Sequence, residues 1–169
     1  MLYNILTLNK IAAIVTSRLG DNYKYGDDVQ NPDAVLVRSA AMRDMEFADN
    51  LLAIARAGAG TNNIPKDKCS EQGIVVFNTP GANANAVKEL VIAGLLISNR
   101  KVIEGYEWAK TLKGNGAAVG KMVEKGKSQF VGPEIKGKTL GVIGLGAIGM
   151  LVANAAVALG MNVIGFDPF

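Results

Sequence analysis

The chain has 169 residues and no histidine, so an imidazole acid, base or metal ligand would have to come from other residues or another chain. Hydrophobic residues make up 49% of the sequence and charged residues 20%, a composition that excludes a disordered tail. Net charge is +3, and Cys69 is the single cysteine. With no intramolecular disulfide possible and no secretion signal evident, we expect a cytoplasmic protein. We also expect no metal site.

Lysine is concentrated in one stretch of the chain. Between Lys101 and Lys138 there are eight lysines and four glutamates. Few aromatic residues accompany these charges, which favours a solvated arm or linker over a nucleic-acid-binding surface. We therefore expect no nucleic-acid partner.

Apolar segments alternate with turn signals in a rhythm typical of parallel βα units. The pattern predicts an α/β fold. Shorter helical or turn segments are predicted at Lys10–Arg18, Met42–Ala48 and Pro65–Gln72, the last with Gly73 just past its end. Strands are predicted at Tyr3–Leu8, Ala34–Arg38, Leu51–Arg56, Ile74–Asn78, Thr139–Ile143 and Asn162–Phe166.

A long apolar stripe at helical spacing covers Ala84–Leu112 and predicts one helix that is too long for a simple crossover. The glycine-rich and lysine-rich residues 114–133 that follow predict a long irregular connection. These segments separate the flanking strands into two groups. We expect an incomplete first domain over residues 1–82, and a second over residues 83–169 that contains the helix, the arm and a first βαβ unit.

The segment Thr139–Phe166 has no charged residue in 28 positions, which satisfies a simple filter for a membrane span. Six glycines and two asparagines divide it into strand, turn, helix and second strand. A parallel strand buried on both faces is itself continuously apolar. The segment therefore predicts a buried βαβ unit, and no membrane partner is expected.

A GxGxxG motif at Gly144, Gly146 and Gly149 lies between the first of these strands and the helix. In such a motif the first glycine permits a sharp turn, the second lets the backbone approach a pyrophosphate, and the third lets the helix pack on the strand. The amino terminus of the helix supplies N–H groups and partial positive charge. The motif predicts a dinucleotide site.

Asp167 ends the second strand, 18 residues after Gly149. This is near the spacing at which a carboxylate meets the ribose hydroxyls of a dinucleotide, and the charge repels a 2′-phosphate. The pair of features favours NAD over NADP. The alternative is a glycine-tight turn that binds nothing, with Asp167 only ending a strand.

Two arginines follow predicted strands in the first half. Arg38 ends one strand, and Arg56 ends the next before the small residues Ala57-Gly58-Ala59-Gly60. Ligands of open α/β sheets bind beyond the carboxyl ends of strands, and backbone N–H groups in a glycine-rich turn are free for an anion. A small anionic substrate is one interpretation, and surface or structural ion pairs are the other.

The chain contains, in order, the segments VLVRSA (35–40), RAGAGTNNIP (56–65), NTPGANANAVKEL (78–90) and GVIGLGAIG with FDP (141–168), which span nearly its whole length. Together these segments resemble the D-isomer-specific 2-hydroxyacid dehydrogenases, especially those acting on 3-phosphoglycerate. The resemblance implies a flavodoxin-like parallel-sheet substrate domain followed by the start of a Rossmann NAD-binding domain. It also implies a homodimer that associates through the helix and arm after residue 83.

The same resemblance implies the roles of individual residues. Substrate contacts fall on Arg38 and on the carboxylate-binding turn Arg56, Ala57 and Gly58. Cofactor contacts fall on the three glycines, on Ala59 near the nicotinamide, on Ala147 and Ile148 at the pyrophosphate, and on Asp167 at the adenosine ribose. Many relatives carry arginine at the position of Ala147, so one phosphate contact is expected to be lost.

The implied reaction is NAD-dependent oxidation of 3-phosphoglycerate to 3-phosphohydroxypyruvate, the first step of serine biosynthesis. The family's catalytic arginine, glutamate and histidine lie beyond the second Rossmann strand, so no catalytic residue is assigned within these residues. We expect this chain alone to be inactive and prone to aggregate. The alternatives are another D-2-hydroxyacid dehydrogenase, of the glyoxylate or lactate type, and a dinucleotide-sensing binding protein of the same fold.

Overall fold

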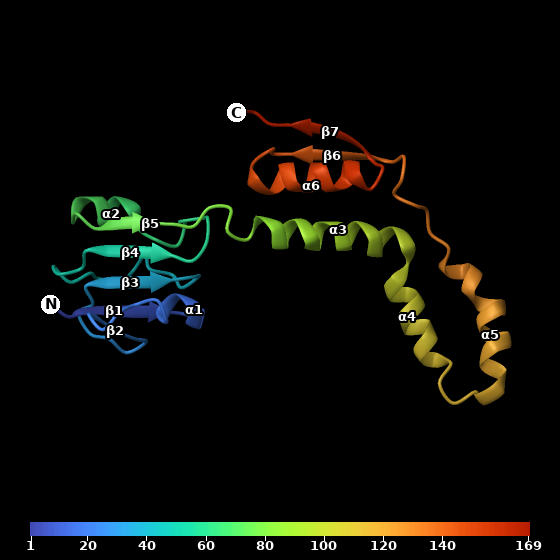
Figure 1. Cartoon of the computed structure of the whole chain (residues 1–169), viewed down its shortest axis with the longest axis horizontal. Helices are drawn as coiled ribbons and strands as arrows, with labels where there is room; N and C mark the ends of the chain where they lie inside the picture. Colours follow the sequence, from blue (N-terminus) through green and yellow to red (C-terminus); the bar gives the residue numbers. More distant parts are fainter. The chain divides into compact units, whose positions relative to one another are not determined.

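Two separate parallel sheets organise the chain, one in each of two units (Figure 1). The structure is a computed structural model and describes residues 1–169. The first unit is Met1–Asn83 and the second is Ala84–Phe169.

The first unit is built on a five-stranded parallel sheet with the strand order β2-β1-β3-β4-β5. This order is the flavodoxin-like one, so the predicted fold class of this half is confirmed. Strand β2 was not among the predicted strands, because it is a short edge strand with the mixed sequence YKYG. The strands are β1 (Tyr3–Leu8), β2 (Tyr23–Gly26), β3 (Ala34–Val37), β4 (Ala53–Arg56) and β5 (Val75–Phe77), and the helices are α1 (Ala13–Thr16) and α2 (Lys66–Glu71).

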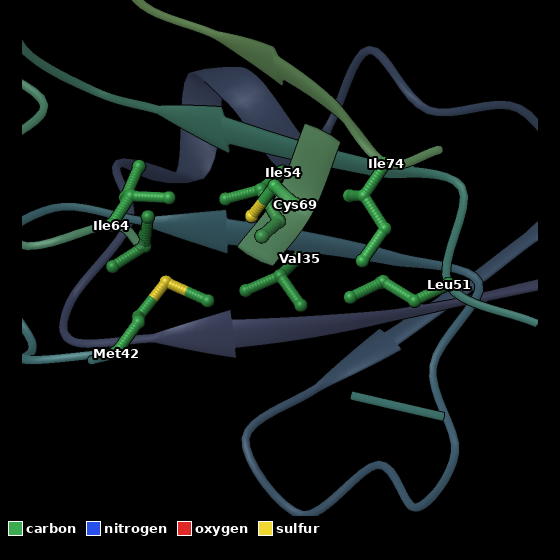
Figure 2. Packing of buried hydrophobic residues seen from close by; sticks show 8 residues of the cluster. Val35, Met42, Leu51, Ile54, Ile64, Cys69 and Ile74 are labelled. Carbon is green, nitrogen blue, oxygen red and sulfur yellow. The ribbon is translucent and has the colours of Figure 1, made fainter. Parts of the chain in front are cut away.

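The core of this unit lies between one face of the sheet and α2 (Figure 2). Val35 and Val37 of β3 alternate with residues that point to the other face, and Val35 is in register with Ile54 of β4. All three are buried together with Cys69 of α2. Cys69 is therefore a core side chain, and its burial in this apolar cluster raises the pKa of its thiol.

Helix α2 passes into β5 through a left-handed glycine. Gly73 has φ +71°, its N–H donates to the Ser70 carbonyl (3.2 Å), and the Ile74 N–H donates to the Cys69 carbonyl (2.8 Å). This double hydrogen bond is the Schellman arrangement, in which glycine has no Cβ to strain. The predicted stop at Gly73 is confirmed.

The segment Met42–Ala48, predicted as helical or turn, forms a turn at Arg43 and Asp44 and no helix, and the Met45 N–H donates to the Met42 carbonyl (3.2 Å). Met42 is fully buried in the core, and its N–H donates to the Asn63 carbonyl (2.9 Å). The predicted Lys10–Arg18 segment contracts to the single turn of α1.

The second unit contains a parallel pair of strands connected by a helix, which is the opening βαβ unit of a Rossmann fold. The βαβ order expected for Thr139–Phe166 is confirmed, but the expected burial of its strands is not, because Ile143, Ile164 and Phe166 are 87%, 67% and 62% exposed. No helix of the structure is long and apolar enough to cross a membrane. The elements are α3 (Ala84–Arg100), α4 (Val102–Thr111), the 3-10 turn η1 (Gly116–Ala118), α5 (Val119–Gly126), the 3-10 turn η2 (Lys127–Phe130), β6 (Thr139–Ile143), α6 (Ala147–Ala158) and β7 (Asn162–Phe166).

The prediction of a single helix over Ala84–Leu112 is wrong, because the helix breaks at Lys101. This residue has φ +47° and separates α3 from α4. The chain returns at this point: a Cβ on Gly132 would collide with the carbonyl oxygen of Asn99, and the Lys101 ammonium donates to the Gln129 carbonyl (3.2 Å). A non-local contact thus decides where the apolar stripe is interrupted.

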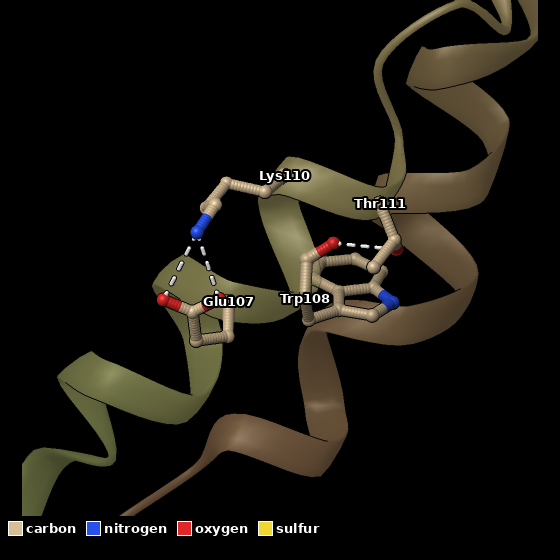
Figure 3. Close-up of polar contacts among 4 residues, drawn as sticks. All are labelled: Glu107, Trp108, Lys110 and Thr111. Atoms are coloured by element: carbon tan, nitrogen blue, oxygen red, sulfur yellow. Dashed lines mark hydrogen bonds and ion pairs between the residues drawn. The ribbon is translucent and has the colours of Figure 1, made fainter.

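The prediction of an irregular connection over residues 114–133 is also wrong, because α5 and two 3-10 turns form there. Trp108 of α4 packs against Phe130 with ring centroids 5.1 Å apart, and a Cβ on Gly126 would collide with the Trp108 ring. The glycine that suggested a loop instead admits an aromatic ring. Figure 3 shows this Trp108 beside the Lys110–Glu107 ion pair (2.9 Å).

We predict that Asp33→Asn destabilises the first unit in a pH-dependent way. The Asp33 carboxylate accepts the Asn4 N–H (2.7 Å) and the Asn50 side-chain N–H (3.1 Å), and these bonds, the Asn4 bond foremost, lower the pKa of Asp33. A lowered folded-state pKa gives stability that is present above the unfolded pKa of about 3.9 and lost as the pH falls through the folded value. Urea midpoints of the two proteins should differ at pH 7 and converge in acid. A constant difference across this range would contradict the assignment.

Candidate functional site

The candidate cofactor site is the glycine loop between β6 and α6. Gly144 follows β6 with φ +89°, and its N–H still donates to the Phe166 carbonyl of β7 (2.8 Å). Gly146 is the N-cap residue of α6, and no side chain caps this helix. The chain therefore turns sharply from strand to helix and leaves the helix terminus open.

Gly149 and Gly146 have different roles, because only Gly149 is required by the fold. A Cβ on Gly149 would collide with the carbonyl oxygen of Gly144, so Gly149 is required for the helix to lie against the turn. A Cβ on Gly146 would meet no atom within 4 Å. The fold itself does not need glycine at this position, and its missing side chain leaves room for a ligand to approach the backbone.

Backbone donors at the start of α6 have no partner in the chain. The first hydrogen bond into the helix runs from the Met150 N–H to the Gly146 carbonyl (3.1 Å). The N–H groups of Ala147, Ile148 and Gly149 precede it and are unpaired. Together with the positive end of the helix dipole, such donors suit a phosphate group.

Asp167 lies at the same loop. One of its carboxylate oxygens accepts the Leu145 N–H (2.6 Å) and the other accepts the Phe169 N–H (3.1 Å). Each carboxylate oxygen can accept a further hydrogen bond. The structure thus brings together the residues predicted for the cofactor in this unit, namely Gly144, Gly146, Ala147, Ile148, Gly149 and Asp167. This arrangement fits a dinucleotide.

The residues predicted for the substrate lie in the first unit, where the parallel strands end at one edge of the sheet. Arg56 folds back over its own loop: its Nε donates to the Arg38 carbonyl (3.0 Å) and its Nη1 to the Asn62 side-chain oxygen (3.3 Å). All of these partners are neutral. No ion pair of the chain involves an arginine, so Arg56 braces the loop and its positive charge remains uncompensated.

The loop after Arg56 offers different donors from those expected. The Ala57 N–H donates to the Val37 carbonyl (2.8 Å) and the Gly58 N–H donates to the Arg56 carbonyl (3.0 Å). The next two N–H groups, those of Ala59 and Gly60, have no partner in the chain. Ala57 and Gly58, predicted as substrate contacts, therefore shape the turn. The free donors are those of Ala59, which was predicted as a cofactor contact near the nicotinamide, and Gly60, which was not predicted.

Arg38 and Arg43 flank this loop. Arg38 is exposed directly after β3, without an ion-pair partner. Arg43 was not predicted, and it donates from Nε and Nη2 to the Asn62 carbonyl (3.1 and 2.8 Å). The edge of the sheet that carries the loop is therefore positively charged.

A set of asparagines was missed by the sequence reasoning. Asn9, with φ +68°, accepts the N–H groups of Ser39 and Ala40 at 2.7 and 2.6 Å. Asn78 donates to the Ala59 carbonyl (2.7 Å). The available signal was their position at strand ends, Asn9 directly after a predicted strand and Asn78 as the last residue of one, where asparagine side chains bond to turns.

The chain was compared with known proteins. The family model described as "D-isomer specific 2-hydroxyacid dehydrogenase, catalytic domain" matches residues 5–162. The chain is 36% identical to D-3-phosphoglycerate dehydrogenase of Mycobacterium leprae, covering 98% of this chain and 32% of that protein. It is 39% identical to hydroxypyruvate reductase of Thermotoga maritima, covering 96% of this chain and 51% of that protein.

Among solved structures, the NAD⁺-bound 3-phosphoglycerate dehydrogenase of Entamoeba histolytica matches with a TM-score of 0.71 and 26% identity, covering all of this chain and 55% of that one. The chain thus spans about a third to about half of the length of these relatives. The resemblance predicted from the sequence is confirmed: the chain belongs to the D-isomer-specific 2-hydroxyacid dehydrogenases.

Proposed function

We propose that this chain provides the substrate-anion loop and the NAD loop of a dehydrogenase that oxidises 3-phosphoglycerate to 3-phosphohydroxypyruvate, the first step of serine biosynthesis. The observation that supports it best is the Asp167 carboxylate held on the Gly144–Gly149 loop by the Leu145 N–H at 2.6 Å. The 36% identity to the M. leprae D-3-phosphoglycerate dehydrogenase favours this substrate.

In this proposal the glycine loop would hold NAD, which would supply the hydride acceptor. The unpaired N–H groups of Ala147 and Ile148 hold the pyrophosphate. Because position 147 is alanine, no side-chain cation from that position contributes, and the backbone donors provide the binding. The Asp167 carboxylate would accept hydrogen bonds from the ribose hydroxyls and would repel a 2′-phosphate.

The substrate is a small anion at the charged edge of the first unit. The free N–H groups of Ala59 and Gly60 bind its carboxylate, beside the uncompensated charge of Arg56. Ala57 and Gly58 hold the turn in shape. Arg38, exposed and without an ion-pair partner, is placed to meet a second anionic group such as a phosphate.

The proposal also includes a homodimer formed through the helix and arm after residue 83. Apolar side chains of α4 support it, because Val102, Ile103 and Tyr106 are 54%, 58% and 63% exposed. Exposed apolar side chains gathered on one element are typical of interaction surfaces.

A reductase of hydroxypyruvate is the second candidate. The 39% identity to the T. maritima enzyme over 96% of this chain favours it. Such a substrate has a carboxylate but no phosphate, so it would use the Ala59–Gly60 donors without Arg38. Competition between phosphorylated and unphosphorylated 2-hydroxy acids on the complete protein distinguishes the two.

We predict that Gly146→Ala weakens NAD binding by roughly tenfold, the equivalent of ~1.4 kcal/mol, without unfolding the protein. The added methyl group meets no protein atom within 4 Å but occupies the space that a pyrophosphate would enter. Asp167→Ala should weaken binding as well, through loss of the ribose acceptor. Isothermal titration with NAD measures both.

Gly141→Ala is the matched control, because a Cβ on this β6 residue also meets nothing within 4 Å but lies in the strand before the loop. NAD affinity of Gly146→Ala equal to that of Gly141→Ala would contradict the proposed cofactor position.

We predict that the 169-residue chain does not reduce NAD with 3-phosphoglycerate. The chain contains no histidine, and none of its residues is assigned as the acid or base that would move the hydroxyl proton. Absorbance of NADH at saturating substrate measures this directly. Formation of NADH above that of a substrate-free control would show that the catalytic groups are present here.

A further inference from the structure

The loop that follows Arg56 is tethered by its carbonyl groups to the segment after β5. The Thr79 N–H donates to the Gly58 carbonyl (3.0 Å), and the Asn78 side-chain N–H donates to the Ala59 carbonyl (2.7 Å). The Thr79 hydroxyl reaches the Arg56 carbonyl (3.4 Å). Consecutive carbonyl groups of the loop therefore point towards Asn78 and Thr79.

The direction of each tethered carbonyl group also fixes the direction of the N–H group in the same peptide. A trans peptide is planar, and its C=O and N–H point in opposite directions. The Gly58 carbonyl shares a peptide with the Ala59 N–H, and the Ala59 carbonyl shares one with the Gly60 N–H. With both carbonyl groups anchored on Asn78 and Thr79, both N–H groups point away from that segment.

Nothing in the chain uses these two donors. Neither the Ala59 nor the Gly60 N–H has a hydrogen-bond partner, and both residues are exposed. A Cβ on Gly60 would lie 3.2 Å from the Arg56 Nη1, so the guanidinium is close behind the donors. Successive N–H groups that point the same way beside a cation form an anion site.

We propose that Asn78 is a positioning residue for this anion site, which takes the carboxylate end of a 2-hydroxy acid. The inference deepens the proposed function and rests on it. Asn78 does not touch the ligand. Its side-chain N–H fixes the Ala59–Gly60 peptide, so that the donors are oriented before the ligand arrives. Preorganised donors bind more tightly because their ordering cost is met in folding.

The tether at Asn78 is the removable one. Thr79 holds the Gly58 carbonyl through its backbone, whereas Asn78 acts through its side chain. Without the Asn78 donor, the Ala59–Gly60 peptide can rotate and its N–H can leave the anion. The Gly58–Ala59 peptide stays anchored, so one of the two donors should be affected more than the other.

The test measures binding of glycolate, the simplest 2-hydroxy carboxylate, to the ¹⁵N-labelled complete protein by NMR. We expect Asn78→Ala to raise the dissociation constant about tenfold and to shift the Gly60 amide signal more than the Ala59 signal before ligand is added. Asn78→Asp keeps the size but replaces the donor with an acceptor, and should weaken binding at least as much.

The control is Asn50→Ala, which removes a carboxamide from the other end of the sheet, near the amino ends of the strands. This carboxamide donates to the Asn31 carbonyl (2.9 Å) and to the Asp33 carboxylate (3.1 Å). It should bind glycolate like the unmodified chain. NAD affinity and urea midpoint, measured on all variants, separate loss of orientation from loss of fold.

Each outcome has one meaning. Weaker glycolate binding in both Asn78 variants, with unchanged NAD affinity, supports the inference. Binding that is unchanged in Asn78→Ala overturns it, even if Asn78→Asp is weaker, because the added charge then explains the loss. If the unmodified chain shows no glycolate-dependent shift at Ala59 or Gly60, the proposed substrate site fails, and the inference fails with it.

Discussion

Both candidate sites depend on unpaired backbone N–H groups. The fold leaves these groups free at the carboxyl ends of parallel strands, where they can bind an anion. At the amino terminus of α6, the Asp167 carboxylate accepts the hydrogen bond of the Leu145 N–H, and the N–H groups of Ala147, Ile148 and Gly149 remain unpaired. In the first unit, strand pairing and a tight turn use the donors of Ala57 and Gly58, and the next two remain open. A main-chain donor does not change its charge with pH and is present in every residue except proline, so such sites depend on the conformation of a turn.

In the first unit, the side chains around the open donors orient the backbone without cancelling positive charge. Asn9, Asn62 and Asn78 bond the loops at the edge of the first sheet, and all are neutral. Arg56 bonds only to neutral oxygens, and no ion pair of the chain includes an arginine. A carboxylate among these partners would compete with a bound anion, so a neutral amide is well suited to bracing an anion loop.

Local signals predicted much of this arrangement, and non-local contacts explain where the predictions were wrong. All strands except β2, the GxGxxG turn and Asp167 follow from periodicity and spacing. The break at Lys101 depends on Gly132 returning to Asn99, and α5 depends on Trp108 filling the space at Gly126. Neither contact is visible in the segment that it shapes. The free donors at Ala59 and Gly60 could not be predicted either, because they depend on tethers from residues that follow another strand.

The most direct test of the account is a crystal structure of the protein with NAD or ADP-ribose. The account predicts the diphosphate within hydrogen-bond distance of the N–H groups of Ala147 and Ile148, with the adenosine ribose hydroxyls on Asp167 and no shift of the Gly144 turn. Nucleotide bound elsewhere, or side chains filling the space beside Gly146, would contradict it and leave an α/β fold whose glycine loop serves packing alone.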